Sequence, residues 1–123
     1  MKLKKCFKCG LLLKEMGECS LKNCDVICCN EKMKNLKANT TEASFEKHIP
    51  NYEIVGDSII VTVDHVMEED HFIEWIACSH ENKENFVYLN PGEKAEAEFE
   101  YAKGTVIYAY CNKHYLWSAE ITD

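Results

Sequence analysis

Short runs of alternating apolar and polar residues begin near residue 45 and continue to the end of the chain. Residues 95–101 alternate cleanly, so that Ala95, Ala97, Phe99 and Tyr101 fall on one face of a predicted strand. Runs rich in β-branched and aromatic side chains predict further strands at residues 49–54, 59–63, 72–77, 86–89, 106–110 and 116–121. About seven short strands separated by turn signals indicate a mainly β domain, either a sandwich or a small barrel.

The first part of the chain has a different texture and the opposite charge. Residues 1–37 are rich in lysine and cysteine, show no sustained helical or strand period, and hold nine Lys and four acidic residues, a formal charge of +5. The remaining residues hold five Lys and seventeen acids, or −12, so the whole chain carries −7. This contrast predicts a small metal-binding domain at 1–37, a polar linker at 38–44 and a main domain at 45–123.

Composition also excludes several classes of protein. An acidic main domain argues against nucleic-acid binding, and no run of about eighteen apolar residues occurs that would cross a membrane. The apolar run near the start is only Leu11, Leu12 and Leu13, too short for a secretion signal, so we expect a cytoplasmic protein. In that reducing compartment, closely spaced cysteines bind metals more often than they form disulfides.

Four of the eight cysteines have the spacing of a closed metal site. Cys6 and Cys9 form a Cys-x-x-Cys knuckle followed by Gly10, which relieves the tight turn, and the partner pair is the adjacent Cys28-Cys29. Four thiolates suit zinc or a single iron, so a structural zinc knuckle and an electron-transferring iron site both remain open. Adjacent cysteines reach two corners of a tetrahedron less easily than a spaced pair does, so we expect some angular distortion.

Two more cysteines lie in the loop between these pairs. Cys19 and Cys24 leave several alternatives open, because either could replace a ligand or the two could pair with each other. We treat both as bystanders of the metal site. Cys78, at the end of a predicted strand, is expected to be a small buried apolar residue.

A second set of metal-ligand residues lies at the ends of the predicted strands. Its members are His48, His65, His71, Cys111 and His114. The chain has five histidines, and only His80, in a charged loop, stays outside this set. Any one of these histidines alone would more often be a surface or core residue, but together they suit a borderline transition metal. Five protein donors leave one octahedral position open for a small molecule.

Glu46 and Lys47 directly precede His48. A solvated charged pair is the ordinary interpretation of such a sequence. Because both residues are tethered beside a candidate ligand, we expect Lys47 to attract an anion towards the open position above an otherwise acidic domain. We expect Glu46 to reach that position when the metal is oxidised.

These motifs resemble those of superoxide reductase, in its two-iron form, desulfoferrodoxin. Cys6-x-x-Cys9 with Cys28-Cys29 resembles the desulforedoxin-type iron module. Glu46-Lys47-His48, His65 to His71, and Cys111-x-x-His114 with Leu116-Trp117 resemble the motifs of the catalytic domain. The resemblance covers essentially the whole chain. It departs at Val66, where proline is common, at Tyr115, where glycine is common, and in the cysteine-containing loop at 10–27.

The resemblance implies a fold, an activity and partners. It implies a small desulforedoxin- or rubredoxin-like metal knuckle followed by an immunoglobulin-like seven-stranded β-sandwich. It further implies a homodimer and one-electron reduction of superoxide to hydrogen peroxide at an iron centre with four histidine ligands and one cysteine ligand, with the iron re-reduced by a donor such as rubredoxin. The four-cysteine site would hold Fe or Zn. Competing hypotheses are a superoxide dismutase, a pure electron carrier, and a zinc-knuckle interaction module without catalysis.

Overall fold

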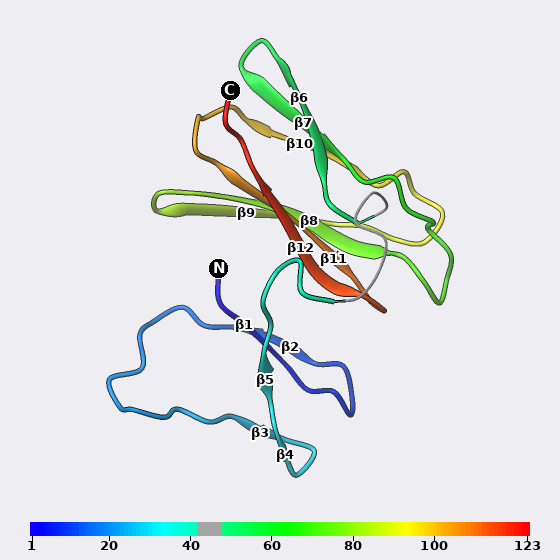
Figure 1. Cartoon of the computed structure of the whole chain (residues 1–123). Helices are drawn as coiled ribbons and strands as arrows, with labels where there is room; N and C mark the ends of the chain where they lie inside the picture. Colours follow the sequence, from blue (N-terminus) through cyan, green and yellow to red (C-terminus); the bar gives the residue numbers. More distant parts are fainter. Residues whose placement is uncertain (42–47) are drawn as a thin grey trace. The chain divides into compact units, whose positions relative to one another are not determined.

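The computed structural model describes residues 1–41 and 48–123, and the chain divides into two compact units, Met1–Lys37 and Ala38–Asp123 (Figure 1). The described residues form strands, turns and loops, without a helix. Accordingly, this part of the chain offers no helix of the length and apolar character needed to cross a membrane.

The larger unit consists of two antiparallel sheets. The three-stranded sheet has the order β10 (Glu96–Glu100), β7 (Ser58–Thr62), β6 (Asn51–Val55). The four-stranded sheet has the order β12 (Tyr115–Glu120), β11 (Val106–Cys111), β8 (Ile73–His80), β9 (Lys83–Tyr88). These strands overlap the seven predicted segments, and the expected mainly β fold with a sandwich-like main domain is confirmed.

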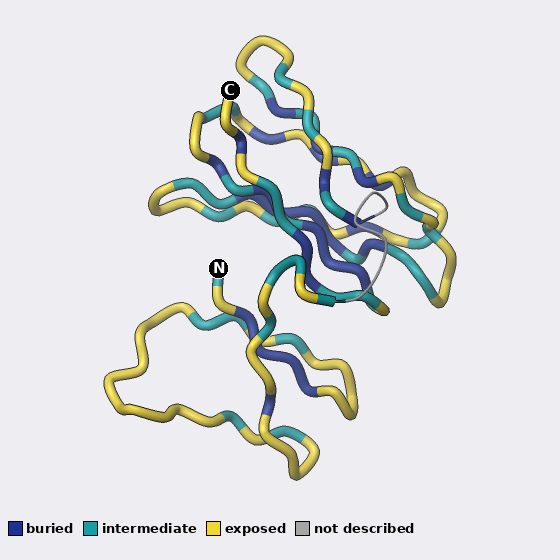
Figure 2. Tube along the Cα trace, in the orientation of Figure 1, coloured by how far each residue is buried: buried dark blue, intermediate teal, exposed yellow. Residues whose placement is uncertain are grey.

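Alternation along the strands builds the core between the sheets. Ile59 and Val61 of β7 are fully buried, as are Ile107 and Ala109 of β11, and the buried stretches follow these strands in Figure 2. The predicted face of β10 is confirmed, because Ala95, Ala97 and Phe99 are buried and Tyr101 packs against the same cluster. Cys78 is a buried core member, as expected.

One irregularity in the four-stranded sheet lies beside the candidate ligands. Tyr110 of β11 is paired with Trp75 of β8, but the next residue, Cys111, is paired with Ile73. The register shift leaves Glu74 as an extra residue on β8. A bulge of this kind bends the strand and re-aims the side chains next to it.

The smaller unit is held by very short strands. β1 (Leu3–Lys5) lies between β2 (Leu12–Lys14) and β5 (Lys34–Asn35), while β3 (Ile27–Cys28) pairs with β4 (Glu31–Lys32). The sequence pattern does not reveal these strands, because two or three residues are too few to establish a period. The buried apolar side chains of this unit are Leu3, Cys6 and Met33, and most of its residues are coloured as exposed in Figure 2.

Two adjacent residues with positive φ shape the β3–β4 hairpin. Cys29 and Asn30 have φ of 52° and 62° and form the two-residue connection between the strands. Positive φ at both positions is what a type I′ hairpin turn requires. This backbone turns the side chain of Cys29 away from the direction that an extended residue after Cys28 would take, and so allows neighbouring cysteines to face one site.

Candidate metal centre

The loops at one end of the sandwich bring together the five residues predicted as ligands of a catalytic metal. His48 precedes β6, His65 follows β7, and His71 precedes β8. Cys111 ends β11, and His114 lies in the connection to β12. One ligand atom from each of the five lies within 4.8 Å of all the others.

The spacing of these donor atoms matches a shared metal. His48 Nε2 is 3.2 Å from His65 Nε2 and 3.1 Å from His114 Nδ1. Ligands at right angles around a metal, at bond lengths of about 2.1 Å, lie about 3.0 Å apart. The Cys111 sulfur is 3.5 Å from His65 Nε2 and 3.9 Å from His114 Nδ1, as a longer metal–sulfur bond would allow.

His71 contributes a polar atom that lacks a protein partner. Its Nε2 is buried and forms no hydrogen bond with any described residue, while its ring lies 4.6 Å from that of His65 between centroids. Burial, followed by the charges of His114, Lys113 and His48, lowers the pKa of His71. A neutral imidazole with a free buried nitrogen is the state in which histidine binds a metal.

Contacts behind the ligands orient them. His65 Nδ1 is 2.6 Å from the carbonyl oxygen of Val66, so a proton on Nδ1 leaves the Nε2 lone pair directed at the cluster. The indole of Trp117 stacks on His48, with a centroid distance of 4.8 Å, and its Nε1 donates a hydrogen bond to the carbonyl of His114 at 2.9 Å. Trp117 thus contacts the ring of His48 and the backbone of His114.

The Cys111 thiol is fully buried. Burial raises the pKa of Cys111, and the backbone N–H groups of Lys113 and His114 act in the opposite direction by donating towards its sulfur. A metal cation would supply the charge compensation that burial withholds from the thiolate, and the two N–H groups would temper its donation.

The cysteines of the smaller unit form a second cluster. Cys6, Cys9, Cys28 and Cys29 place their sulfurs within 4.8 Å of one another. Cys9 Sγ is 3.6 Å from Cys28 Sγ, which is 3.9 Å from Cys29 Sγ. Tetrahedral ligands at metal–sulfur bonds of about 2.3 Å lie about 3.8 Å apart. Gly10, with φ of 87°, donates to the carbonyl of Cys6 at 2.8 Å and closes the knuckle as predicted.

The thiols of this cluster differ strongly in pKa. The backbone N–H groups of Cys9 and Lys8 lower the pKa of Cys6 to about 6 against the effect of burial. Hydrogen bonding with Cys6 and Cys9 raises the pKa of Cys28 to about 12. Hence the second thiol resists ionisation beside the first, and four thiolates require a cation among them.

Comparison with known proteins places the chain in a family. The sequence model of the desulfoferrodoxin family matches residues 39–120. The desulfoferrodoxin of Syntrophotalea carbinolica is 43% identical over 100 residues, covering 78% of this chain and 79% of the relative. That of Nitratidesulfovibrio vulgaris is 38% identical over 120 residues, covering 94% and 93%. The chain belongs to the desulfoferrodoxin family.

A solved structure supports the same assignment. The superoxide reductase from Treponema pallidum superposes with a TM-score of 0.71 at 25% identity, covering 96% of this chain and 98% of that one. The desulfoferrodoxin family binds iron at both kinds of site, and this chain carries both donor sets. The resemblance read from the motifs is therefore confirmed at the level of the family.

Two of the predicted site residues lack a described position, and one residue that the sequence did not single out supports the cluster. Glu46 and Lys47 lie outside the described residues. Asn112, between Cys111 and His114, holds the backbone on either side of His71, accepting from the N–H of Phe72 at 3.0 Å and donating from Nδ2 to the carbonyl of Asp70 at 3.0 Å. Its place inside Cys-x-x-His was the only sequence signal that could have drawn attention to it.

The remaining histidine and the Cys19–Cys24 pair belong to neither cluster. His80 Nε2 is 3.1 Å from the carbonyl oxygen of Lys103 and takes no part in the five-residue cluster. Cys19 and Cys24 form a disulfide with each other, which settles the alternative that the sequence left open.

Proposed function

We propose that this protein is a superoxide reductase whose active centre is a mononuclear iron held by His48, His65, His71, Cys111 and His114. The observation that supports it most directly is that one ring nitrogen from each of four histidines and one cysteine sulfur lie within 4.8 Å of one another. Iron bound there would give one electron to superoxide, which with two protons becomes hydrogen peroxide. The protein's own groups would hold the metal, adjust its electron density, attract the superoxide anion and orient a proton donor.

The donor set suits transfer of a single electron to a small anion. Four neutral imidazoles leave the metal's positive charge nearly intact, while the Cys111 thiolate supplies electron density. The backbone N–H groups of Lys113 and His114 limit that donation. A metal held by these five donors would keep a coordination position for substrate.

We assign the handling of substrate to the two residues before His48. Residues 38–123 carry a formal charge of −12, which repels superoxide at long range. Lys47 provides a local positive charge that attracts the anion and orients a proton-donating water. Glu46 would offer a hard carboxylate oxygen to an oxidised metal.

We also propose the arrangement that the resemblance implied. Residues 1–37 form a metal domain with iron or zinc bound by Cys6, Cys9, Cys28 and Cys29, residues 38–44 a linker, and residues 45–123 the catalytic domain. A donor such as rubredoxin re-reduces the iron, and the protein removes superoxide as a cytoplasmic homodimer.

A direct test measures metal content, the visible spectrum and product stoichiometry. The oxidised wild type should contain iron and show a sulfur-to-iron charge-transfer band. Reduced protein should form one hydrogen peroxide per superoxide consumed, without evolving dioxygen. Dioxygen release without an external reductant would instead indicate a dismutase. A redox-silent catalytic site would indicate an electron carrier. Zinc alone after anaerobic iron reconstitution would indicate an interaction module.

Matched variants tie that test to the cluster. Cys111→Ser should abolish the sulfur-to-iron charge-transfer band of the five-residue centre and leave any band of iron at the four-cysteine site in place. Cys78→Ala, at the other buried cysteine of the sandwich, should retain both. His71→Ala should lose iron and activity, and His80→Ala should lose neither. Equal behaviour of the paired variants would contradict the assignment of ligands.

A further inference from the structure

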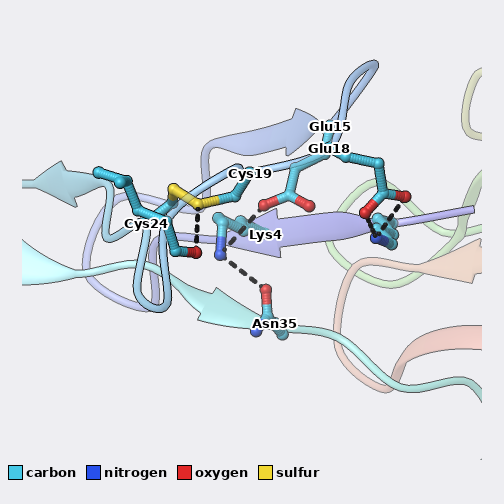
Figure 3. Close-up of polar contacts among 8 residues, drawn as sticks. Lys4, Glu15, Glu18, Cys19, Cys24 and Asn35 are labelled. Carbon is cyan, nitrogen blue, oxygen red and sulfur yellow. Dashed lines mark hydrogen bonds and ion pairs between the residues drawn. A yellow bond between two sulfur atoms is a disulfide. The ribbon is translucent and has the colours of Figure 1, made fainter.

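A disulfide lies in the loop between β2 and β3 of the smaller unit. It joins Cys19 and Cys24, five positions apart in sequence and 6.1 Å apart between Cα atoms (Figure 3). Both residues are exposed and neither belongs to a metal cluster. The proposed reaction makes no use of them.

The loop around this bond buries no apolar side chain. Residues 16–25 are all exposed, including Met16 and Leu21. Its ends are held by polar contacts, from Lys2 Nζ to Glu18 at 3.1 Å and from Lys32 Nζ to Asp25 at 3.2 Å. Breaking the disulfide would therefore release a solvated loop without opening a hydrophobic core, so the bond is not needed to bury the core of this unit.

A cavity of about 530 Å³ adjoins the disulfide. Cys19 and Cys24 line it together with three lysines and three acidic residues, Lys2, Lys4, Lys22, Glu15, Glu18 and Asp25. Lys4 is held inside by Glu15 at 3.3 Å and by the side-chain oxygen of Asn35 at 2.8 Å, as the close-up shows (Figure 3). Glu18 and Asp25 of the lining pair with Lys2 and Lys32. An incoming thiol would find space beside the sulfurs and the positive charge of Lys22 on the same cavity wall.

Positive charge near this bond favours thiol chemistry. The unit carries a formal charge of +5 before its thiolates and any metal are counted, and Lys22 lines the same cavity as the two sulfurs. Positive groups stabilise both the attacking thiolate and the thiolate that leaves, the two anionic species of disulfide exchange. Exposure, a flanking cavity and lysine side chains thus coincide at one sulfur–sulfur bond.

We propose that Cys19 and Cys24 form a reversible thiol–disulfide exchange site whose partner is an external dithiol. A thiolate of the partner attacks one sulfur, forming a mixed disulfide and releasing the other cysteine as a thiolate that takes up a proton. The partner's second thiol then displaces the first cysteine. Two electrons and two protons pass to Cys19 and Cys24, and the partner becomes a disulfide. This inference stands independently of superoxide reduction.

The test uses the full, metal-loaded chain and dithiothreitol as the dithiol. Protein is equilibrated anaerobically at pH 7 with mixtures of reduced and oxidised dithiothreitol, quenched in acid, alkylated and mapped by mass spectrometry. Cys19 and Cys24 should become alkylated together in one two-electron transition that oxidised dithiothreitol reverses, with metal content and far-UV circular dichroism unchanged. Resistance to excess dithiothreitol until denaturant is added, or loss of metal during reduction, would overturn the proposal.

Two kinds of variant test the cysteine pair and the path of the incoming thiol separately. Cys19→Ser should remove the transition and leave Cys24 alkylated at every ratio of reduced to oxidised dithiothreitol. The metal content of this variant shows whether the unit is folded. A surviving transition would mean that Cys19 and Cys24 are not the cysteines that exchange. Lys22→Gln should slow reduction by about twofold at low salt, while Lys8→Gln, an equal charge change away from the cavity, should not. Equal rates would overturn the cavity as the path of the incoming thiol.

Discussion

Asn112 and Phe72 are joined by two hydrogen bonds that tie the His71 loop to the Cys111–His114 turn. The backbone N–H of Phe72 donates to Oδ1 of Asn112 at 3.0 Å, and the backbone N–H of Asn112 donates to the carbonyl of Phe72 at 3.2 Å. The same side chain also donates to the carbonyl of Asp70. Asn112 is therefore a positioning residue that links the backbone near three candidate ligands, His71, Cys111 and His114, without belonging to the ligand cluster.

Replacement of Asn112 should weaken metal binding. Asn112→Ala removes both side-chain hydrogen bonds, and loss of such supporting contacts typically costs about 10–100-fold in metal affinity. Asn112→Asp keeps the acceptor for Phe72 and should fall between Asn112→Ala and the wild type. The measurement is iron retention against a competing chelator, with Asn51→Ala on the exposed edge of β6 as the control. Unchanged retention in Asn112→Ala would remove the positioning role.

The lowered pKa of His71 predicts acid sensitivity of the metal-free sandwich. Because its folded pKa lies below the ordinary value of 6.5, the unfolded chain binds more protons in the interval between the two values. Stability should therefore rise with pH through that interval and be lost as pH falls below 6.5.

Urea midpoints of the metal-free protein from pH 7.5 to pH 5 test this dependence. The midpoint should decline more in the wild type than in His71→Gln, which does not titrate. His80→Gln is the matched control and should follow the wild type. Parallel curves for the wild type and His71→Gln would contradict a lowered pKa of His71.

Lys47 should matter most for the capture of superoxide. Lys47→Ala should lower the second-order rate by about tenfold at low ionic strength and flatten its salt dependence, because local steering of an anion is screened by salt. Stopped-flow or pulse-radiolysis kinetics would measure both effects. Lys83→Ala, the same charge change in β9, should alter neither. An unchanged second-order rate of superoxide capture in Lys47→Ala would contradict electrostatic steering by Lys47.

The backbone at Tyr115 should favour glycine over alanine. Tyr115 has φ of 67° and closes the three-residue connection between β11 and β12, a hairpin in which a left-handed residue commonly follows the turn. Tyr115→Gly and Tyr115→Ala both lose the aromatic ring, but only alanine keeps the Cβ clash of this conformation. Tyr115→Gly should be more stable by about 1 kcal/mol in urea unfolding. Equal stability of the two would argue against strain there.

Much of the fold and the site could be predicted because both depend on local patterns. The strands show in alternations such as that of β10, and the five candidate ligands lie at strand ends, where a sheet brings distant loops together. The role of Asn112 could not be foreseen, because it depends on the register shift between Tyr110 and Cys111. The pairing of Cys19 with Cys24 depends on the path of an exposed loop, which spacing does not determine.

The small core of the first unit links its folding to metal supply. With Leu3, Cys6 and Met33 as its buried apolar side chains, the unit has little apolar burial with which to offset the entropy of ordering its chain. Where metal binds only the folded form and is above its dissociation constant, each tenfold fall in free metal removes about 1.4 kcal/mol of stability. The free energy of unfolding of the first unit would thus follow the logarithm of the free metal concentration, and the ratio of folded to unfolded first units would fall tenfold with each tenfold fall in free metal.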